Sequence, residues 1–458
     1  MRRYSKVNSA SNSSVLDRFE DSKSTLIPYR LFLVYLISFF LHLPSRLSFL
    51  GTIRFDFLLV LLISFYIIGS KSIKPNKLDP ASKYLFFIFV YAIVTLPLVE
   101  WPGSVIREGL IAFIKGAIFY FFTVNLVVNE RRLKAVVFVF VICNLIRVVE
   151  PLFMHLTTGY LGSETYLGMG EFAGRLSGAP SDVINPNGLA FVIATIFPFL
   201  HYVFSPLNSI SKSMYLAISI ALIYTMVLTL SRSGALALLI IAFGVFLKSN
   251  RKGLLTIIGL AGIAIIYSNL DPIEKDRYLS IVSDDARQSA TAEGRIDGWF
   301  RDFRVAMNRP IVGHGLGTSR EASWNVAGED KVSHILWAEI WQEIGIIGLA
   351  LFLLYLRAMV RNFLSAGQLI KRKLPKDDFL YRANEAMQVW LLMNLLFSLA
   401  SYGLKSYEWY FFGGLSVVLL KMANKKVLSD ERGGVEVTSQ LEIASKKFPL
   451  LKRLKEYK

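Results

Sequence analysis

Long apolar segments alternate with short polar ones along most of the chain. A membrane-spanning helix needs about 20 mostly apolar residues, and several segments are shorter, which indicates tilted or bent helices. The pattern predicts an all-α polytopic membrane protein with about twelve transmembrane helices over residues 30–421. The segments lie at about 30–45, 53–70, 84–100, 106–128, 134–154, 188–205, 213–231, 233–249, 253–269, 334–356, 386–404 and 407–421.

Four polar regions interrupt or flank this pattern. Residues 1–29 are rich in Ser, Asn and charge, which predicts a flexible tail, and residues 422–458 are basic and fit an amphipathic helix along the inner leaflet. Lys and Arg accumulate on the cytoplasmic side of membrane proteins, and most of the 51 in this chain fall in these tails and in alternate loops. That bias places both tails in the cytoplasm and the two large loops, at about 155–187 and 270–333, outside.

Composition narrows the class further. Hydrophobic residues make up 53% of the chain, and the mean hydropathy is +0.47. A net charge of +17 would suggest nucleic-acid binding in a soluble protein, but these cations lie between apolar segments. Anchoring among membrane lipids explains them, so no nucleic-acid partner is expected. The single Cys143 can form neither an intrachain disulfide nor a cysteine metal cluster, and no two histidines have metal-ligand spacing. No removable signal peptide is evident near the N-terminus.

A Ser231-Arg232-Ser233-Gly234 turn separates two apolar segments on the predicted outer side. Arginines often anchor helix ends, but normally on the cytoplasmic side. A guanidinium group matches phosphate oxygens in a bidentate way. The outer position of Arg232 therefore favours a role in binding a phosphate-linked substrate.

The second outer loop contains an amphipathic pattern over residues 296–307. The spacing predicts a helix that rests on the membrane surface, with Trp299 at headgroup depth. Arg295 stands at its predicted start, where the helix N-terminus adds positive charge and favours an anion. In the glycine-rich first outer loop, Arg175 is either a third phosphate contact or a solvated arginine.

A titratable base follows at the start of the tenth apolar segment. Ser333 is a suitable N-cap, which would place His334 in the first helical turn and favour its neutral form. Histidine is the side chain best suited to accept a proton near neutral pH. His314, in a glycine-rich turn, is the main competitor for this role. Glu339 and Glu343 either orient His334 or simply line the helix.

The order of these motifs resembles the shared domain of bacterial O-antigen ligases and related polysaccharide polymerases. The resemblance covers about residues 170–360 and implies a membrane-embedded glycosyltransferase of the C-type (GT-C) fold in the bacterial inner membrane, with its active site and large loop facing the periplasm. The motifs that carry it are Asn185-Pro186-Asn187-Gly188, Ser231-Arg232-Ser233-Gly234, Gly294-Arg295 with Trp299, residues 310–317, His334 and residues 343–349.

The resemblance also implies the chemistry and the partners. Two arginines of the family hold the diphosphate of an undecaprenyl-diphosphate-linked glycan donor, and a histidine activates the acceptor hydroxyl without a metal or other cofactor. Carried over by motif, these roles fall on Arg232, Arg295 and His334, with Arg175 as a further diphosphate contact. A single displacement would invert the anomeric carbon. The physics is coherent, because guanidinium groups stabilise the charge that develops on the leaving diphosphate.

Polymerase and ligase differ in their acceptor, which is the next lipid-linked repeat unit or lipid A-core. Residues 339–349 are slightly more similar to polymerases, so we predict a surface-polysaccharide polymerase, acting on O-antigen or exopolysaccharide, with ligase as the alternative. A lipid-linked glycan transporter or flippase is the alternative from another class. It would place charges inside the spans, where Arg107 and Lys115 are candidates, and it usually shows internal repeats, of which none is convincing.

Overall fold

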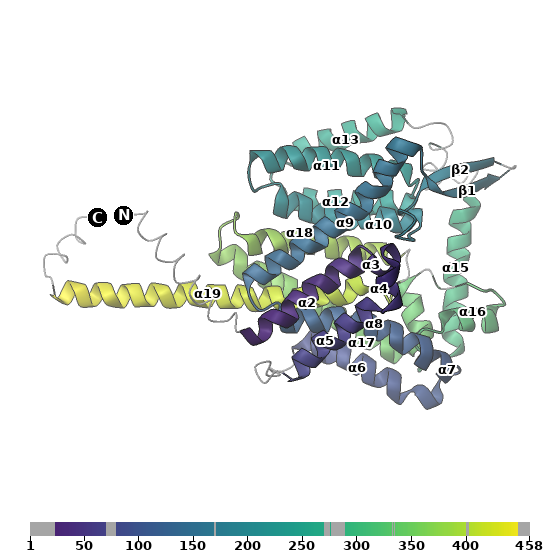
Figure 1. Ribbon diagram of the computed structural model, residues 1–458, viewed down its shortest axis with the longest axis horizontal. Helices are drawn as coiled ribbons and strands as arrows, with labels where there is room; N and C mark the ends of the chain where they lie inside the picture. Colours follow the sequence, from purple (N-terminus) through teal and green to yellow (C-terminus); the bar gives the residue numbers. More distant parts are fainter. Residues whose placement is uncertain are drawn as a thin grey trace.

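The computed structural model describes residues 23–69, 79–168, 171–269, 275, 289–331, 333, 335–399 and 403–447. This part of the chain is mostly helical, and its main helices lie side by side in a bundle (Figure 1). Each predicted apolar segment overlaps one of them. These helices are α2 (Lys23–Phe40), α5 (Phe55–Gly69), α6 (Pro80–Val94), α8 (Leu110–Leu126), α9 (Glu130–Thr158), α10 (Pro186–Phe199), α11 (Ser209–Leu228), α12 (Arg232–Lys248), α13 (Lys252–Asn269), α17 (Leu336–Lys373), α18 (Phe379–Phe397) and α19 (Tyr407–Lys447).

Shorter elements connect the bundle helices. Two π-helical turns join neighbouring helices, one before α8 and one after α10. The connecting elements are α3 (Leu43–Arg46), α4 (Ser48–Thr52), the 3-10 turn Leu96–Leu98, α7 (Pro102–Ser104), the π turns Val105–Gly109 and Leu200–Phe204, α15 (Ser289–Asn308) and α16 (Ser319–Ala327).

The protein is a membrane protein. Among the described residues, five helices are long and apolar enough to cross a bilayer. Others, such as α5 and α6, are apolar but shorter, as the sequence pattern predicted. The total of about twelve crossings and the GT-C architecture stay predictions. The five long segments are Pro102–Leu126, Glu130–Thr158, Pro186–Phe204, Ser209–Leu228 and Leu336–Lys373.

Both tail boundaries differ from the prediction. Helix α2 begins at Lys23, inside the stretch predicted as a tail, and residues 1–22 lie outside the described part. At the other end, α19 continues to Lys447 instead of ending near residue 421. It runs on in a straight line away from the bundle (Figure 1), and its placement along the inner leaflet stays a prediction. Good helix formers are frequent in residues 422–447, so nothing breaks the helix at the end of its apolar part.

The first outer loop contains regular structure, although its glycines favour turns. Strands β1 (Gly162–Gly168) and β2 (Glu171–Leu176) form an antiparallel hairpin in which Thr165 pairs with Ala173 and Ser163 with Arg175. Aromatic rings of Tyr166 and Phe172 contact across the strands, a pairing that stabilises two-stranded sheets. In this hairpin the cross-strand pairs outweigh the turn preference of the glycines.

Close helix contacts build the centre of the bundle. Helix α19 packs against α8 and α17, and α17 also packs against α6. Trp390 stacks on Phe412 with ring centroids 3.4 Å apart. A Cβ at Gly413 would lie 1.8 Å from the Tyr355 hydroxyl, so only glycine lets these helices approach so closely.

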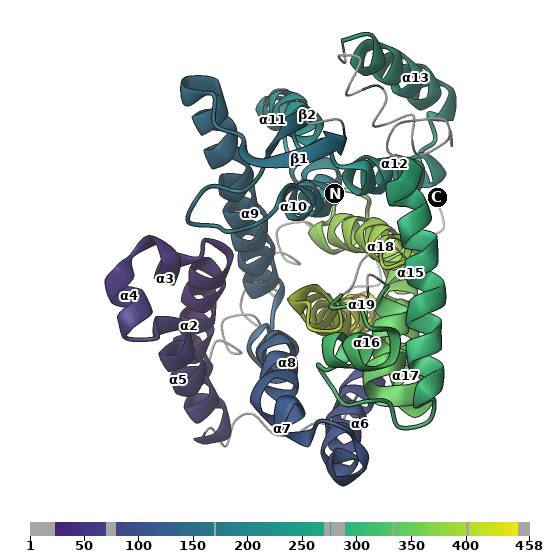
Figure 2. The same cartoon turned by 90° about the vertical axis from the view of Figure 1, so that its right-hand side faces the viewer.

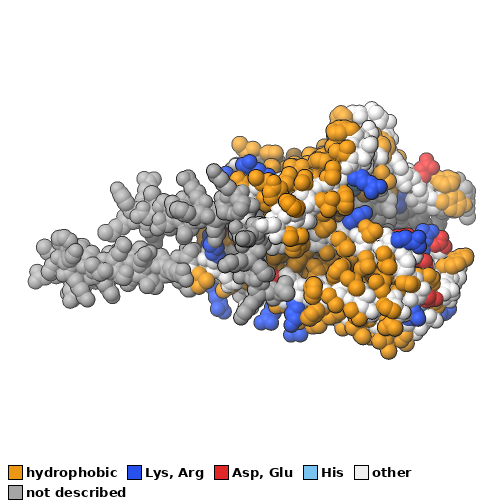
Figure 3. Space-filling model, turned by 60° about the horizontal axis from the view of Figure 1, so that its bottom comes forward, with side chains coloured by type: hydrophobic (Ala, Val, Ile, Leu, Met, Phe, Trp, Pro, Cys, Tyr) orange, Lys and Arg blue, Asp and Glu red, His pale blue; other side chains and the backbone are white. Residues whose placement is uncertain are grey.

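The two predicted outer loops lie at the same end of the bundle. The hairpin, α15 and α16 gather there, whereas the start of α2 and the projecting part of α19 lie at the opposite end (Figure 1). Figure 2 looks onto the loop end, where α15 runs across the ends of the bundle helices. Between the two ends, hydrophobic side chains dominate the surface, and Lys and Arg cluster where α19 leaves the bundle (Figure 3).

Candidate active site

Arg175 is buried beneath the hairpin, with 7% of its surface exposed. Its Nε donates to the Thr229 carbonyl oxygen at 2.8 Å and its Nη2 to Asn187 Oδ1 at 2.9 Å. Its Nη1 reaches Thr165 Oγ1 at 3.3 Å. Arg175 is therefore not a solvated loop arginine: it joins the hairpin to the ends of two helices. A direct contact with phosphate stays a prediction.

Arg232 is the first residue of α12. Ser231 caps the helix, because its Oγ accepts a hydrogen bond from the Gly234 N–H at 3.1 Å. Just before the cap, Leu230 adopts a left-handed conformation with φ 48°, which is unfavourable for a leucine and turns the chain sharply. The half-buried Arg232 thus stands at the positive end of the helix, where an anion would be attracted by the side chain and by the helix.

The starts of α10 and α12 are held together by one amide oxygen. Asn187 Oδ1 accepts hydrogen bonds from Ser231 Oγ at 2.9 Å and from Arg175 Nη2 at 2.9 Å. Gly234 permits the contact, since a Cβ there would lie 2.5 Å from the Ala190 Cβ. We call Arg175, Asn187, Ser231 and Arg232 the arginine corner. It brings two positive helix ends and two arginines to one place.

Arg295 lies inside a helix and not at its start. Helix α15 begins at Ser289, so Arg295 falls in the second turn, and the argument from a helix N-terminus at Arg295 was wrong. Ala290 and Ala292 favour helix, and Gly294 does not end it. The side chain of Arg295 lies outside the described residues. The backbone of α15 starts at the part of the loop end that also carries the hairpin (Figures 1 and 2).

Helix α15 packs on the protein through a face that contains an acidic residue. Asp302 is buried together with Val305 and Ala306. The predicted aromatic stripe points away, and 52% of the Trp299 side chain and 69% of Phe300 are exposed. An exposed aromatic face agrees with the predicted membrane-surface helix, whereas the buried aspartate was not predicted.

The start of α17 also differs from the prediction. The helix begins at Leu336 with Ile335 as its N-cap residue, so Ser333 does not cap it and His334 precedes the first turn. His334 itself lies outside the described residues. Ser333 is buried, and its hydroxyl donates to Asp302 Oδ2 at 2.7 Å. The predicted Ser333 cap is therefore wrong, and the neutral form of His334 stays a prediction.

His314 is unsuited to act as a base. It is fully buried, with Nδ1 2.9 Å from Glu100 Oε2 and Nε2 3.1 Å from the carbonyl oxygen of Val305. Each ring nitrogen faces an oxygen atom inside the protein, so neither points toward a substrate. His314 fixes the turn before α16, and the role of His334 stays a prediction.

Glu339 and Glu343 bind backbone N–H groups of two loops. Glu339 Oε2 accepts from the N–H groups of Gly403 and Leu404, both at 3.0 Å, and Glu343 Oε2 accepts from Gly317 N–H at 2.7 Å. These carboxylates hold loops against the first turns of α17. We call Asp302, Ser333, Glu339 and Glu343 the carboxylate corner.

A kink follows directly in α17. Ile344 and Gly345 are non-helical, and Gly345 has φ 65°. A Cβ at Gly345 would lie 2.0 Å from the carbonyl oxygen of Ile311, so the turn at residues 310–317 fits against a glycine. The glycines in the motif at 343–349 thus have a packing role.

The charges proposed for a transporter face outward. Arg107 lies in the π turn before α8 and bonds the carbonyl oxygen of Gly103, and Lys115 lies on α8. Both side chains are exposed on the bundle surface, as is Glu108. These side chains therefore lie outside the helix packing of the described residues.

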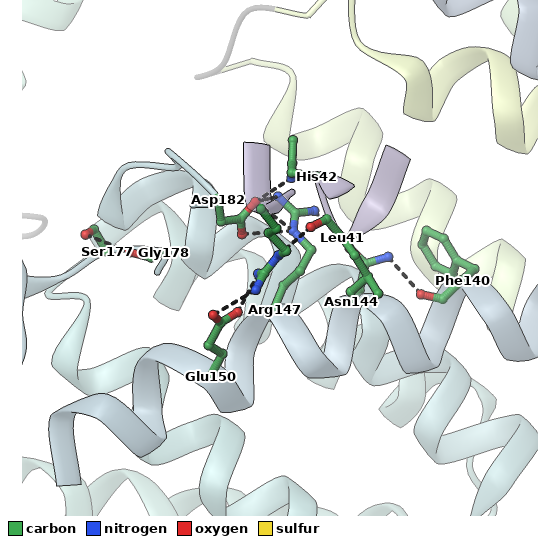
Figure 4. A network of polar contacts seen from close by, with 10 residues as sticks. Leu41, His42, Phe140, Asn144, Arg147, Glu150, Ser177, Gly178 and Asp182 are labelled. Carbon is green, nitrogen blue, oxygen red and sulfur yellow. Dashed lines mark hydrogen bonds and ion pairs between the residues drawn. The ribbon is translucent and has the colours of Figure 1, made fainter. Parts of the chain in front are cut away.

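A buried charge network beneath the arginine corner was missed by sequence analysis. Arg147, inside α9, binds Asp182 through Nε at 2.9 Å and Nη2 at 3.0 Å (Figure 4). His42 Nδ1 lies 2.7 Å from Asp182, and Arg46 pairs with Glu150 nearby. A charged residue inside an apolar segment was the available signal for Arg147.

This network fixes the chain that leads into α10. Burial raises the pKa of Asp182, but hydrogen bonds from His42 and Arg147 outweigh burial and leave the pKa below its ordinary value. The carboxylate is therefore charged at neutral pH. It ties the turn after α2 to α9 and to the loop that precedes Pro186.

Comparison with known proteins identifies part of the chain. Residues 217–353 match the family described as O-Antigen ligase. No curated protein sequence matches significantly. A solved structure, from work on the coordination of polymerization and crosslinking by a peptidoglycan synthase complex, is similar with a TM-score of 0.39 and 16% identity, covering 74% of this chain and 96% of that chain.

Proposed function

Because residues 217–353 form an O-antigen ligase domain, we propose that this membrane protein transfers an undecaprenyl-diphosphate-linked glycan to a hydroxyl acceptor at the periplasmic face of the inner membrane. The observation that carries the proposal is the extent of the match. It begins within α11, includes Arg232 and the whole of α15, spans His334 and ends within α17. Within this stretch, α15, α16 and the described loops beside them lie at one end of the bundle (Figure 2).

In the proposed reaction the acceptor oxygen attacks the anomeric carbon of the donor glycan. The bond to the diphosphate oxygen breaks, the diphosphate leaves with the electron pair, and the anomeric configuration inverts. His334 takes the proton of the acceptor hydroxyl, an assistance worth about 100- to 10,000-fold in rate. Arg232 and Arg295 hold the leaving diphosphate without a metal ion.

The arginine corner supports the role of Arg232. Charge builds up on the diphosphate as the glycosidic bond breaks, and groups fixed in advance stabilise such charge best. Arg232 is fixed at the start of α12 by the Ser231 cap, and Arg175 holds the preceding turn through the Thr229 carbonyl. In this proposal Arg175 contributes its positive charge to the diphosphate site and maintains its shape.

The acceptor decides between two activities of one mechanism. We propose a surface-polysaccharide polymerase, whose acceptor is the next lipid-linked repeat unit, because residues 339–349 resemble polymerases slightly more. A ligase that attaches polymer to lipid A-core is the alternative.

Complementation separates the two activities. Cells that lack the chain receive wild type, Arg232→Ala, Arg295→Ala or His334→Ala, and surface polysaccharide is resolved on gels. Single repeat units on lipid A-core without longer ladders identify a polymerase. Polymer on the lipid carrier with bare core identifies a ligase.

Purified protein tests the site itself. Wild type in detergent should lengthen or transfer the glycan of a lipid-linked donor, and each of the three variants should lose most of this activity. Matched controls are Arg251→Ala, Arg304→Ala and Lys331→Ala, which remove exposed cations close to the same elements. Equal activity in wild type and all three site variants would refute the site, and no transfer by wild type with either acceptor would favour the transporter.

A further inference from the structure

Asp302 connects α15 with the segment that leads into α17. Its side chain is 1% exposed. One carboxylate oxygen, Oδ2, accepts a hydrogen bond from Ser333 Oγ at 2.7 Å. The other, Oδ1, accepts from Arg301, with Nη2 at 3.1 Å and Nε at 3.3 Å. Both oxygens are thus engaged, by groups from different parts of the chain.

The charge of Asp302 is balanced locally. Arg301 is nearly buried, and its Nη1 also binds Glu329 Oε2 at 3.0 Å, which fixes the guanidinium group from its other side. A buried carboxylate is costly unless it is paired, and a charged acceptor makes a stronger hydrogen bond than a neutral one. The ion pair therefore orients Asp302 for its bond to Ser333.

The same residue also holds α17 through its backbone. Gln342 Nε2 donates to the carbonyl oxygen of Asp302 at 2.9 Å, while Ser333 binds the side chain. Leu336 N–H binds the carbonyl oxygen of Ser398 at 3.2 Å. Helix α15, the segment around Ser333 and the start of α17 are thus joined into one unit at Asp302.

We infer that Asp302 is a positioning residue, which acts through Ser333 to hold the segment before α17 against α15. The inference rests on the proposed function, in which His334 is the base and Arg295, on the same helix as Asp302, binds the diphosphate. The two residues of α15 are separated by seven positions, which is about 10 Å along a helix. One helix backbone therefore connects Arg295 with the residue that holds Ser333.

This geometry predicts which kinetic constant changes. Loss of the Ser333 bond leaves the diphosphate contacts intact but lets the base drift from the acceptor oxygen. A misplacement of about 1 Å can cost about 100-fold in rate. We therefore expect kcat to fall about 10- to 100-fold, with the KM for the lipid-linked donor unchanged.

The test uses the purified full-length chain with a lipid-linked donor. Variants are Ser333→Ala, Asp302→Asn, Asp302→Ala and the double variant Ser333→Ala/Asp302→Ala. Ser333→Thr keeps the hydroxyl and should restore kcat. Ser323→Ala is the matched control, because Ser323 has a buried hydroxyl that finds no hydrogen-bond partner among the described residues. If both residues act through one bond, the double variant should be no slower than Asp302→Ala.

A second readout does not depend on catalysis. Hydrogen exchange of a peptide covering residues 330–336 should become faster in Ser333→Ala and Asp302→Ala and stay unchanged in Ser323→Ala. Unchanged exchange in all variants would overturn the inference, whatever the activity.

The outcomes separate the two hypotheses. If His334→Ala is inactive while Asp302→Ala and Ser333→Ala keep wild-type kcat, the positioning role is wrong and the proposed function stands. If His334→Ala is as active as wild type, the proposed base is wrong and the positioning role falls with it. Asp302→Asn retains the size of the side chain, so a loss of kcat at normal yield and melting temperature cannot come from misfolding.

Discussion

The arginine corner and the carboxylate corner lie at the same end of the bundle but use their polar groups in opposite ways. In the arginine corner, short side chains hold two helix ends together and leave positive helix ends near the surface. In the carboxylate corner, acidic side chains turn inward and bind backbone N–H groups of loops. The contrast teaches that polar groups at one end of a bundle can serve two purposes: buried acids hold loops in place, while the starts of two helices keep their positive ends near the surface.

The largest effect should come from the arginine corner. Arg232→Ala removes the cation from the start of α12 and should lower transfer at least about 100-fold, since a fixed donor to developing charge is worth about that much. Arg232→Lys keeps the positive charge but lacks the planar guanidinium group. Its transfer rate should lie between those of wild type and Arg232→Ala. Transfer by purified protein, with Arg251→Ala as control, measures this. Full activity of Arg232→Ala would show that the corner does not bind the donor.

A large effect on stability should come from the kink beside the carboxylate corner. Gly345→Ala places a Cβ 2.0 Å from a backbone oxygen at positive φ and should destabilise the protein by about 2 to 4 kcal/mol. Thermal unfolding in detergent measures the change. Gly253→Ala is the control, because a Cβ at Gly253 meets nothing within 4 Å. Equal melting temperatures would show that the turn at residues 310–317 can move away without cost.

A smaller effect should follow from separating the two helix ends of the arginine corner. Asn187→Ala removes the oxygen that accepts from Ser231 and Arg175, and each lost hydrogen bond costs about 1 kcal/mol. We expect transfer to fall about tenfold, and Asn187→Asp, which keeps an acceptor, to retain more activity. Asn125→Ala, an exposed amide on α8, serves as control. A larger loss in Asn187→Asp than in Asn187→Ala would mean that charge, not the shared acceptor, matters here.

The smallest effect concerns acid stability beneath the arginine corner. The pKa of Asp182 is lowered in the folded protein, so its stabilisation is present above the unfolded pKa of about 4 and is lost as pH falls through the folded value. The melting temperature of wild type should exceed that of Asp182→Asn by a constant amount between about pH 5 and 8. This difference should shrink below about pH 4. A difference that grows on acidification would contradict the direction of the pKa shift.

Sequence analysis was most successful where the physics is local. Apolar segments long enough for helices depend on neighbouring residues, and each predicted segment overlaps a helix. Helix ends were less predictable. Ser333 is a good cap by residue type, but its hydroxyl is taken by Asp302, which lies 31 positions away in the chain. Such a competition is decided by tertiary contacts that no local pattern contains.

The same limit applies to buried charges. The polar positions on α15 gave no sign that Asp302 faces inward, because an aspartate between arginines is usually solvated. His314 likewise could not be distinguished from a base until its two acceptors were known. The roles of Arg295 and His334 stay predictions from the sequence motifs. The structure adds that Arg295 lies on the backbone of α15.

The length of α19 has a mechanical consequence. A helix of 41 residues measures about 60 Å, roughly twice the hydrocarbon thickness of a bilayer. The helix leaves the bundle without a bend (Figure 1), so it is too long to fit inside the hydrocarbon layer along the membrane normal. A large part of α19 must therefore lie beyond that layer or cross it obliquely.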